Sequence, residues 1–206
     1  MKGGVVYSYS AADDAINSAG TFTIEGGKLC GYAVRNDGLD ANGNFYINGG
    51  LVYAIGTTAP EVAIDANTEG GYKLYVQGGT LIAIGGLESG ASLTQSCYSA
   101  SWNKNTWFSL TVGDEVFAFK TPSSGGTTLV VSGATQPTLK SGVTVSGGTS
   151  LFEGLITTNG SISGGSDVTL TTYTGGGFGP GGGFGPGGGF GPGGGFGPGG
   201  GRPGGW

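Results

Sequence analysis

The sequence predicts an all-β protein that begins as a parallel β-helix with coils of about 23 residues, continues as further β structure and ends in a disordered glycine-rich tail. Three observations predict this fold class. A four-residue phrase recurs at a nearly constant spacing, apolar and polar residues alternate around it, and no stretch has the apolar spacing of a long helix.

The recurring phrase is an apolar residue, a variable residue and two glycines. Its copies are Met1-Lys2-Gly3-Gly4, Ile24-Glu25-Gly26-Gly27, Ile47-Asn48-Gly49-Gly50 and Val76-Gln77-Gly78-Gly79, at spacings of 23, 23 and 29 residues. A period of this length is typical of solenoids. Each period contains three short strand-like pieces separated by Gly, Asn and Asp, which favours coils stacked about 4.8 Å apart as in a parallel β-helix.

Strand alternation assigns side chains to two faces. We expect Phe22, Ile24, Phe45, Ile47, Leu74 and Val76 to point inward, and Thr23, Tyr46 and Tyr75 to point outward. The double glycine follows each of these strands, where the chain must turn sharply, because glycine tolerates positive φ and close backbone approach.

Three segments divide the chain. Residues 1–86 form the coils, residues 87–174 form additional β structure that continues the helix or packs on it, and residues 175–206 form a tail of GGGFGP repeats. In the middle segment, residues 105–112 and 115–122 predict a hairpin around Gly113-Asp114, and antiparallel pairing is expected. The tail is predicted to be disordered, with a surface tether or adhesive tail as its functional alternative and packed polyproline II strands as a third interpretation.

Composition excludes several functions. The net charge of −5 and the pI near 4.5 argue against nucleic acid as a partner, and no apolar run is long enough to span a membrane. The chain has no His, which excludes His-based triads. Cys30 and Cys97 are either two buried thiols or a disulfide of an exported protein. Because Met1 lies inside the first phrase and no export signal precedes it, we expect the chain to be a fragment.

Acidic residues recur at equivalent positions of successive coils. Asp13, Asn36 and Glu61 share one position, Asp14 and Asp37 the next, and Asn17, Asp40 and Asp65 a third. Stacked carboxylates repel one another, and a bound Ca²⁺ would relieve the repulsion, so Asp13, Asp14, Asp37, Asp40 and Asp65 are candidate metal ligands. Alternatively, these residues only form turns.

Aromatic residues offer candidate sugar-binding surfaces. After the double glycine, Tyr7, Cys30, Tyr53 and Ile82 align, as do Tyr9, Tyr32, Ile55 and Ile84, and both rows should face outward. Residues 88–174 are expected to cover this stripe, with an exposed aromatic platform as the alternative. Tyr98, Trp102 and Trp107 lie in a polar stretch and are the better platform candidates, followed by Tyr53 and Tyr32.

The units ADDAINSAGTFTIEGG (residues 12–27) and NDGLDANGNFYINGG (residues 36–50) resemble the right-handed parallel β-helix "carbohydrate-binding domain-containing protein" family of clostridia and gut Bacteroidales. The resemblance covers residues 1–86, with a weaker echo at 140–165. It implies an exported protein that binds polysaccharide, including acidic plant polymers, and that holds Ca²⁺ at Asp13, Asp14, Asp37 and, more loosely, Asp40 and Asp65. The third copy departs from the family phrase, because Glu61-Val62 replaces its acidic pair.

These observations predict a non-catalytic, extracellular or cell-surface polysaccharide-binding protein, assisted by calcium. One alternative is a structural or adhesive surface protein that self-associates through its open coil end or its tail. The other is a calcium-dependent polysaccharide lyase that uses Arg35 or Lys73 as a base.

Overall fold

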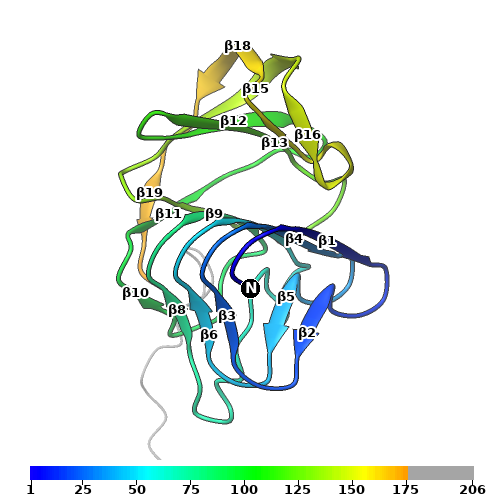
Figure 1. The fold of residues 1–206 in the computed structure, drawn as a ribbon, viewed down its shortest axis with the longest axis vertical. Coiled ribbons are helices and arrows are strands. Elements are labelled where there is room, and N and C mark those ends of the chain that lie inside the picture. The colour runs from blue at the N-terminus through cyan, green and yellow to red at the C-terminus, as the bar shows by residue number, and fades with distance from the viewer. Residues whose placement is uncertain (176–206) are drawn as a thin grey trace, which may run out of the picture.

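The computed structural model describes residues 1–175 and is all-β, with a single 3₁₀ turn at Phe152–Gly154 as the only helix in that range. The strands form one mixed sheet, two parallel sheets and one antiparallel sheet that lies above them (Figure 1). The predicted disordered tail comprises residues 175–206, and all of it except Gly175 lies outside the described residues. No helix within residues 1–175 is long and apolar enough to cross a membrane.

The first sheet has seven strands and changes direction partway. It begins with four parallel strands: β1 (Val5–Ser10), β4 (Lys28–Ala33), β7 (Leu51–Ile55) and β9 (Thr80–Ile84). Three strands continue it with antiparallel pairing: β14 (Leu129–Ser132), β11 (Cys97–Ala100) and β19 (Thr171–Tyr173). The parallel row is therefore closed at one side by antiparallel strands.

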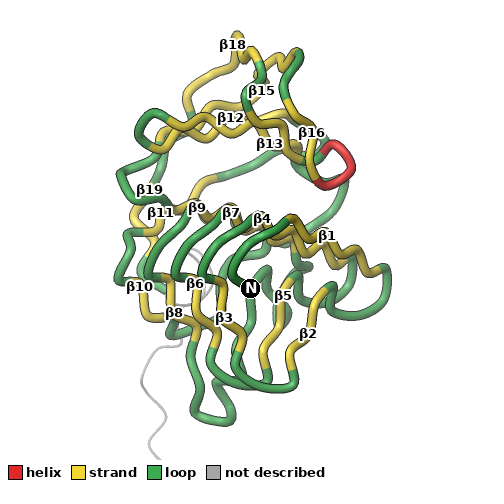
Figure 2. Tube along the Cα trace, in the orientation of Figure 1, coloured by secondary structure: helices red, strands yellow, loops and turns green. Residues whose placement is uncertain are grey.

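Two further parallel sheets run beside the first (Figure 2). The second sheet contains β3 (Phe22–Ile24), β6 (Phe45–Ile47), β8 (Leu74–Val76) and β10 (Ser92–Leu93). The third contains β2 (Ile16–Ser18) and β5 (Leu39–Ala41), and single parallel bridges at Ile64 and Leu87 extend it.

The register of these sheets reproduces the sequence repeat. Val5 pairs with Lys28, Lys28 with Leu51, and Leu51 with Thr80, so each repeat lies directly on the next. We number the repeats 1 (residues 5–24), 2 (28–47), 3 (51–76) and 4 (80–93). Each repeat gives one strand or bridge to each of the three sheets, because the same turn residues recur at the same places.

Residues enclosed by the three parallel sheets form the first apolar core. Phe45, Ile47, Leu74 and Val76 are fully buried there, while Tyr46 and Tyr75 stay partly exposed. The predicted alternation of inward and outward side chains is therefore confirmed for repeats 2 and 3. In repeat 1, Phe22 is only partly buried, because it lies in the outermost layer of the core.

The antiparallel sheet covers the outer face of the first sheet. Its strands are β12 (Trp107–Val112), β13 (Glu115–Lys120), β15 (Thr138–Ser146), β16 (Thr149–Leu151), β17 (Ile156–Thr158) and β18 (Ser161–Asp167). The hairpin predicted around Gly113-Asp114 is confirmed by the pairing of Val112 with Glu115. Between the two sheets lies a second apolar core, in which Ile55, Ile82 and Ile84 meet Phe108 and Phe119.

Glycine is required where the repeats turn and where two backbones meet. Gly27, Gly50 and Gly79, the second glycines of the phrase, have φ of +94°, +83° and +83°, a region that side chains disfavour. At another point Gly31 lies against Gly38, and a Cβ on Gly31 would overlap the Gly38 carbonyl oxygen. These positions explain why glycine is so frequent in the first half of the chain.

Candidate functional site

Two rows of acidic and amide side chains run across the stacked repeats. In the first row, Asp14 Oδ1 accepts a hydrogen bond from the Asp37 backbone N–H at 3.2 Å, and Asp37 Oδ1 accepts one from the Val62 N–H at 2.6 Å. Asp13 Oδ1 accepts one from the Asn36 amide at 3.0 Å. Each acidic side chain therefore binds the repeat that lies next to it.

The second row consists of Asn17, Asp40, Asp65 and Glu88, one from each repeat. The Asn17 amide donates to Asp40 and, at 3.1 Å, to Asp14. The Glu88 carboxylate accepts a hydrogen bond from the Thr68 hydroxyl at 3.1 Å. Glu88 was not among the predicted metal ligands, but it directly follows Leu87, just as Asp65 follows Ile64.

Burial changes the protonation of these rows. Burial raises the pKa of Asp37 to about 8, although the Val62 N–H opposes the shift. Burial and the neighbouring Asp65 raise the pKa of Asp40 to about 7, and burial and Glu88 raise that of Asp65 to about 7. Below these values the carboxyl groups hold protons, which removes the repulsion that the sequence suggested a cation would relieve.

The carboxyl groups of these rows do not gather at one point. Within residues 1–175, no three acidic or cysteine side chains converge in a way that could hold a metal ion. The carboxyl groups are spread along the stacking direction, and several of their oxygens already accept hydrogen bonds from backbone N–H groups. Turn formation and stacking account for Asp14 and Asp37 without a bound ion.

The prediction that Tyr53 binds sugar is wrong, because Tyr53 is fully buried in the second core. Its ring lies edge-on to Phe119, with centroids 5.8 Å apart, and its hydroxyl donates to the Lys120 carbonyl at 2.8 Å. Tyr32 is partly buried and contacts Tyr9 edge-on, with centroids 5.2 Å apart. The antiparallel sheet covers the outward-facing residues that follow the double glycines. Only the end of these rows in repeat 1, which includes Tyr9, stays exposed.

The other predicted platform residues lie on different elements of the fold. Trp102 is partly buried, and its indole N–H donates to the Gly126 carbonyl at 3.0 Å. Tyr98 lies in β11 and packs against the second core, and Trp107 begins β12 with partial burial. Trp102 and Tyr98 therefore have structural roles, and sugar binding by any of the three residues remains a prediction.

A different aromatic surface lies on the outer face of the second sheet. Tyr46 and Tyr75 are adjacent in the parallel register, and their rings stack with centroids 4.7 Å apart and planes 10° apart. The neighbours in the same row are small, Thr23 on one side and Ser92 on the other. We call this row of four residues the tyrosine face. The sequence analysis placed both tyrosines outward but did not consider them as a site.

Polar side chains flank the tyrosine face. The exposed residues Glu25, Asn48 and Gln77 follow the three strands, and the Asn48 amide donates to the Glu25 carboxylate at 3.1 Å. On the other flank, Asn44 Oδ1 accepts a hydrogen bond from the Lys73 backbone N–H at 2.9 Å. The surface thus combines an apolar ring pair with hydrogen-bonding groups on both sides.

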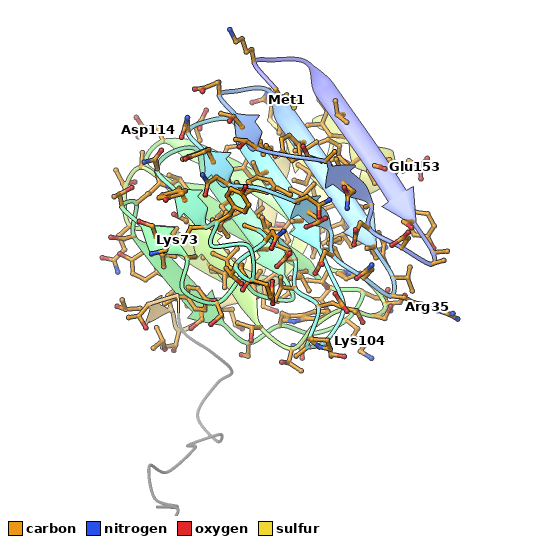
Figure 3. All side chains as sticks on the ribbon, turned by 90° about the horizontal axis from the view of Figure 1, so that it is seen from below. Met1, Arg35, Lys73, Lys104, Asp114 and Glu153 are labelled. Carbon is orange, nitrogen blue, oxygen red and sulfur yellow. The ribbon has the colours of Figure 1, made fainter. Side chains whose placement is uncertain are left out.

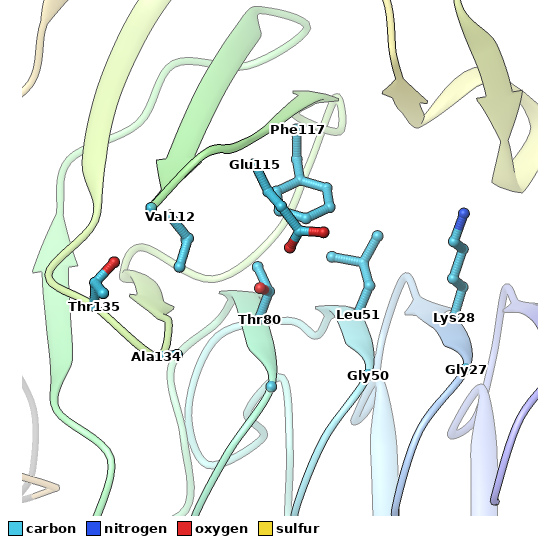
Figure 4. Close-up of a pocket in the computed structure, with 12 residues that line it drawn as sticks. Gly27, Lys28, Gly50, Leu51, Thr80, Val112, Glu115, Phe117, Ala134 and Thr135 are labelled. Atoms are coloured by element: carbon cyan, nitrogen blue, oxygen red, sulfur yellow. The ribbon is translucent and has the colours of Figure 1, made fainter.

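A groove of about 450 Å³ lies between the glycine corners and the hairpin of β12 and β13 (Figure 4). Its wall is largely backbone and apolar side chains, including Leu51, Val112 and Phe117, and Lys28 and Glu115 are its two charged residues. None of the predicted site residues lines it. Its size suits a small ligand, but its polar groups are few.

Two basic residues were considered for a lyase: Arg35, which precedes Asn36 of the first acidic row, and Lys73, whose backbone N–H contacts Asn44. Both residues are exposed. Arg35 extends from the rim of the molecule, and Lys73 lies at a separate place on the surface (Figure 3). Within residues 1–175 the only ion pair joins Lys140 and Asp167, so Arg35 forms no salt bridge with Asp37 there.

The two cysteines are both buried and free. The disulfide alternative is therefore not realised. Cys30 lies in the second core and Cys97 in the first. Burial raises the pKa of both thiols above their ordinary value.

No family model, curated protein or solved structure matches this chain. The resemblance to the β-helix carbohydrate-binding family therefore depends on the repeated sequence units alone.

Proposed function

We propose that this protein is a non-catalytic polysaccharide-binding protein and that the tyrosine face is its binding surface. The observation that supports the proposal is the stacked pair of Tyr46 and Tyr75 on an exterior sheet face with amide side chains beside it. Sugar rings have apolar C–H faces that pack on aromatic rings, and their hydroxyl groups require polar partners. Asn48 and Gln77 are exposed and supply such partners.

The stacking geometry indicates where a sugar would lie. Because the two rings cover each other, each has only its outer surface left for a ligand. Thr23 lies beside Tyr46 and Ser92 beside Tyr75, and both are too small to cover an aromatic ring fully. A polysaccharide lying along the stacking direction could therefore contact both outer ring surfaces.

The repeated units of residues 1–86 are proposed to form a right-handed parallel β-helix, as the family resemblance implies. The parallel register, which advances by one repeat at each step through three sheets, supports this proposal. A β-helix suits polysaccharide binding because its stacked strands give a long, rigid and flat surface. The same resemblance is the basis for proposing an extracellular or cell-surface location.

We also propose that calcium binds to this protein, and the support for this is the row of carboxyl groups on successive repeats. Asp40, Asp65 and Glu88 follow one another on successive repeats, and a cation would stabilise their ionised forms at high pH. Calorimetry with EGTA-treated protein at pH 8 tests this. Heat of binding together with a higher melting temperature would support a metal site, and the absence of both would leave these residues as turn formers.

The binding test uses affinity sedimentation with insoluble cellulose, xylan and cross-linked polygalacturonate. The wild-type protein should sediment with at least one of them, and the double variant Tyr46→Ala/Tyr75→Ala should lose at least ten-fold in affinity. Tyr72→Ala is the matched control, because Tyr72 is exposed but lies outside the tyrosine face. If no polysaccharide is bound, or if the double variant binds as the wild type does, the proposal fails.

The structural or adhesive alternative and the lyase alternative have their own tests. Assembly that depends on residues 175–206 would favour an adhesive role. Release of unsaturated sugars, abolished by Arg35→Ala, would favour a lyase.

A further inference from the structure

Asparagine is followed directly by glycine at three places in the chain: Asn42-Gly43, Asn48-Gly49 and Asn159-Gly160. In such a pair the asparagine side chain can react with the backbone of its own chain. Glycine favours the reaction, because it has no Cβ to hinder the approach of its backbone nitrogen to the side-chain carbonyl carbon. The structure treats the three pairs differently.

The reaction needs only water as a co-reactant. The glycine backbone nitrogen attacks Cγ of the asparagine amide, a cyclic succinimide forms, and the amide nitrogen leaves as ammonia with the proton of the attacking N–H. Water then opens the ring at either of its carbonyl groups. The products are aspartate and isoaspartate, and in isoaspartate the backbone runs through the former side chain. Ring closure requires both the side chain and the backbone of the asparagine to rotate, so contacts that fix either of them oppose it.

The side chains and backbones of Asn42 and Asn48 are fixed by residues that lie next to them in the stack. The Asn42 amide donates to Asn17 Oδ1 at 3.3 Å, and the Asn48 amide donates to the Glu25 carboxylate at 3.1 Å. Their backbone N–H groups also donate to carbonyl oxygens of repeat 1, both at 2.8 Å. Rotation of either residue would break hydrogen bonds of both kinds.

The glycines of these two pairs lie against the backbone of the neighbouring layer. A Cβ on Gly43 would lie 2.8 Å from the Thr21 backbone nitrogen, and one on Gly49 would lie 2.5 Å from the Glu25 carbonyl oxygen. Such close packing leaves little room for the movement that ring closure requires. The stacked layers would have to separate before either pair could react.

The third pair lies in the turn between β17 and β18. Asn159 is exposed, and within residues 1–175 neither its side chain nor its backbone forms a hydrogen bond with another protein group. A Cβ on Gly160 would first meet the methyl group of the Thr157 side chain, at 3.1 Å. Asn159 has a φ of +57°, in the left-handed region that residues with side chains disfavour, so leaving this conformation sacrifices little stability.

We propose that Asn159 is a site of spontaneous covalent modification, at which the side-chain amide is lost through condensation with the Gly160 nitrogen, while Asn42 and Asn48 keep their amides. Each modified molecule gains one negative charge, because an amide becomes a carboxylate. The inference does not depend on polysaccharide binding, since the turn belongs to the antiparallel sheet and the tyrosine face to the second sheet.

The modification has a structural consequence at the end of β18. A Cβ on Gly148 would lie 2.7 Å from the Gly160 Cα, so the two turns that contain these glycines lie close together. Isoaspartate lengthens the backbone beside this contact. We expect it to loosen the adjacent end of the pairing between β15 and β18, where Ser146 pairs with Ser161.

Peptide mapping by mass spectrometry tests the assignment on the full-length protein, incubated at pH 8 and 37 °C. Conversion of amide to acid should be at least ten-fold faster at Asn159 than at Asn42 or Asn48. The same incubation in urea is the control. Because each of the three asparagines precedes a glycine, the unfolded chain should convert all three at similar rates, which would show that the folded structure selects Asn159.

Two variants test the chemistry. Gly160→Ala hinders the attacking nitrogen and should slow conversion at Asn159 at least five-fold, and Asn159→Gln should remove the acidic species from ion-exchange profiles. The proposal is overturned if Asn42 or Asn48 converts as fast as Asn159 in the folded protein, if Asn159 converts only in urea, or if Gly160→Ala converts as fast as the wild type. None of these measurements involves a sugar, so their failure is distinct from failure of the binding proposal.

Discussion

Tyr46 and Tyr75 come from different repeats, 29 residues apart in sequence, yet their rings stack with centroids 4.7 Å apart. The stacking follows from the parallel register, which places equivalent residues of adjacent strands side by side.

The first prediction concerns the flanks of the tyrosine face. Substituting Gln77→Ala or Asn48→Ala should weaken polysaccharide binding about five-fold each, because each change removes one hydrogen-bonding side chain worth about 1 kcal/mol. Isothermal titration with the soluble form of the bound polymer measures the change. Gln95→Ala is unsuitable as a control because its amide binds Ser132 and Gly79 inside the protein. Gln136→Ala, at an exposed position outside the tyrosine face and its flanks, should have no effect on affinity. Equal losses from all three substitutions would contradict a specific role for the flanks.

The second prediction concerns pH. The pKa values of Asp37, Asp40 and Asp65 in the folded protein are about 8, 7 and 7, above the value of about 3.9 in an unfolded chain. The folded state therefore binds protons more tightly than the unfolded state. With respect to these groups, the free energy of unfolding should be highest below about pH 4, should fall as the pH rises from about 4 to 8, and should level off above that. Urea titrations across this range measure it.

The variant Asp65→Asn isolates the middle carboxyl of the second row. It should raise the free energy of unfolding at pH 8 by about 1 kcal/mol, because it removes a charge between Asp40 and Glu88 whose repulsion solvent partly screens, and it should flatten the pH profile. Asp167→Asn is the control, since Asp167 is exposed at the distant β18. A profile that is equally steep in Asp65→Asn would show that the row does not control the pH dependence.

The third prediction concerns close backbone approach. Gly31→Ala should destabilise the protein by about 3 kcal/mol or more, because the new Cβ would overlap the Gly38 carbonyl oxygen and neither backbone can easily move. Gly20→Ala introduces the same methyl group where no atom lies within 4 Å. Thermal melting of the two variants should therefore separate clearly, and similar melting temperatures would mean that the contact between Gly31 and Gly38 can relax.

The fourth prediction concerns the attachment of the antiparallel sheet. Tyr53→Phe should lower the free energy of unfolding by about 1 kcal/mol, because it leaves the Lys120 carbonyl without its side-chain donor. Tyr53→Ala should cost about 3–5 kcal/mol through the cavity it creates in the second core. Tyr53→Phe should not change polysaccharide affinity. A loss of affinity in this variant would restore Tyr53 as a residue that affects the binding surface.

The sequence by itself determined the repeat and the faces of its strands. The double glycines predicted where the chain turns, and the alternation around Phe45 and Ile47 predicted which side chains form the core, because both patterns are local properties of the backbone. The hairpin around Gly113-Asp114 was predicted for the same reason.

Only the tertiary structure decided which outward residues stay exposed. Tyr53 and Tyr46 both point away from the first core, but the antiparallel sheet buries Tyr53 and leaves Tyr46 partly exposed. Likewise, the acidic positions were visible in the sequence, but their raised pKa values and the place of Glu88 in their row depend on which repeat lies beside which. Burial and long-range pairing are properties of segments that meet only in the folded chain, so no local pattern could specify them.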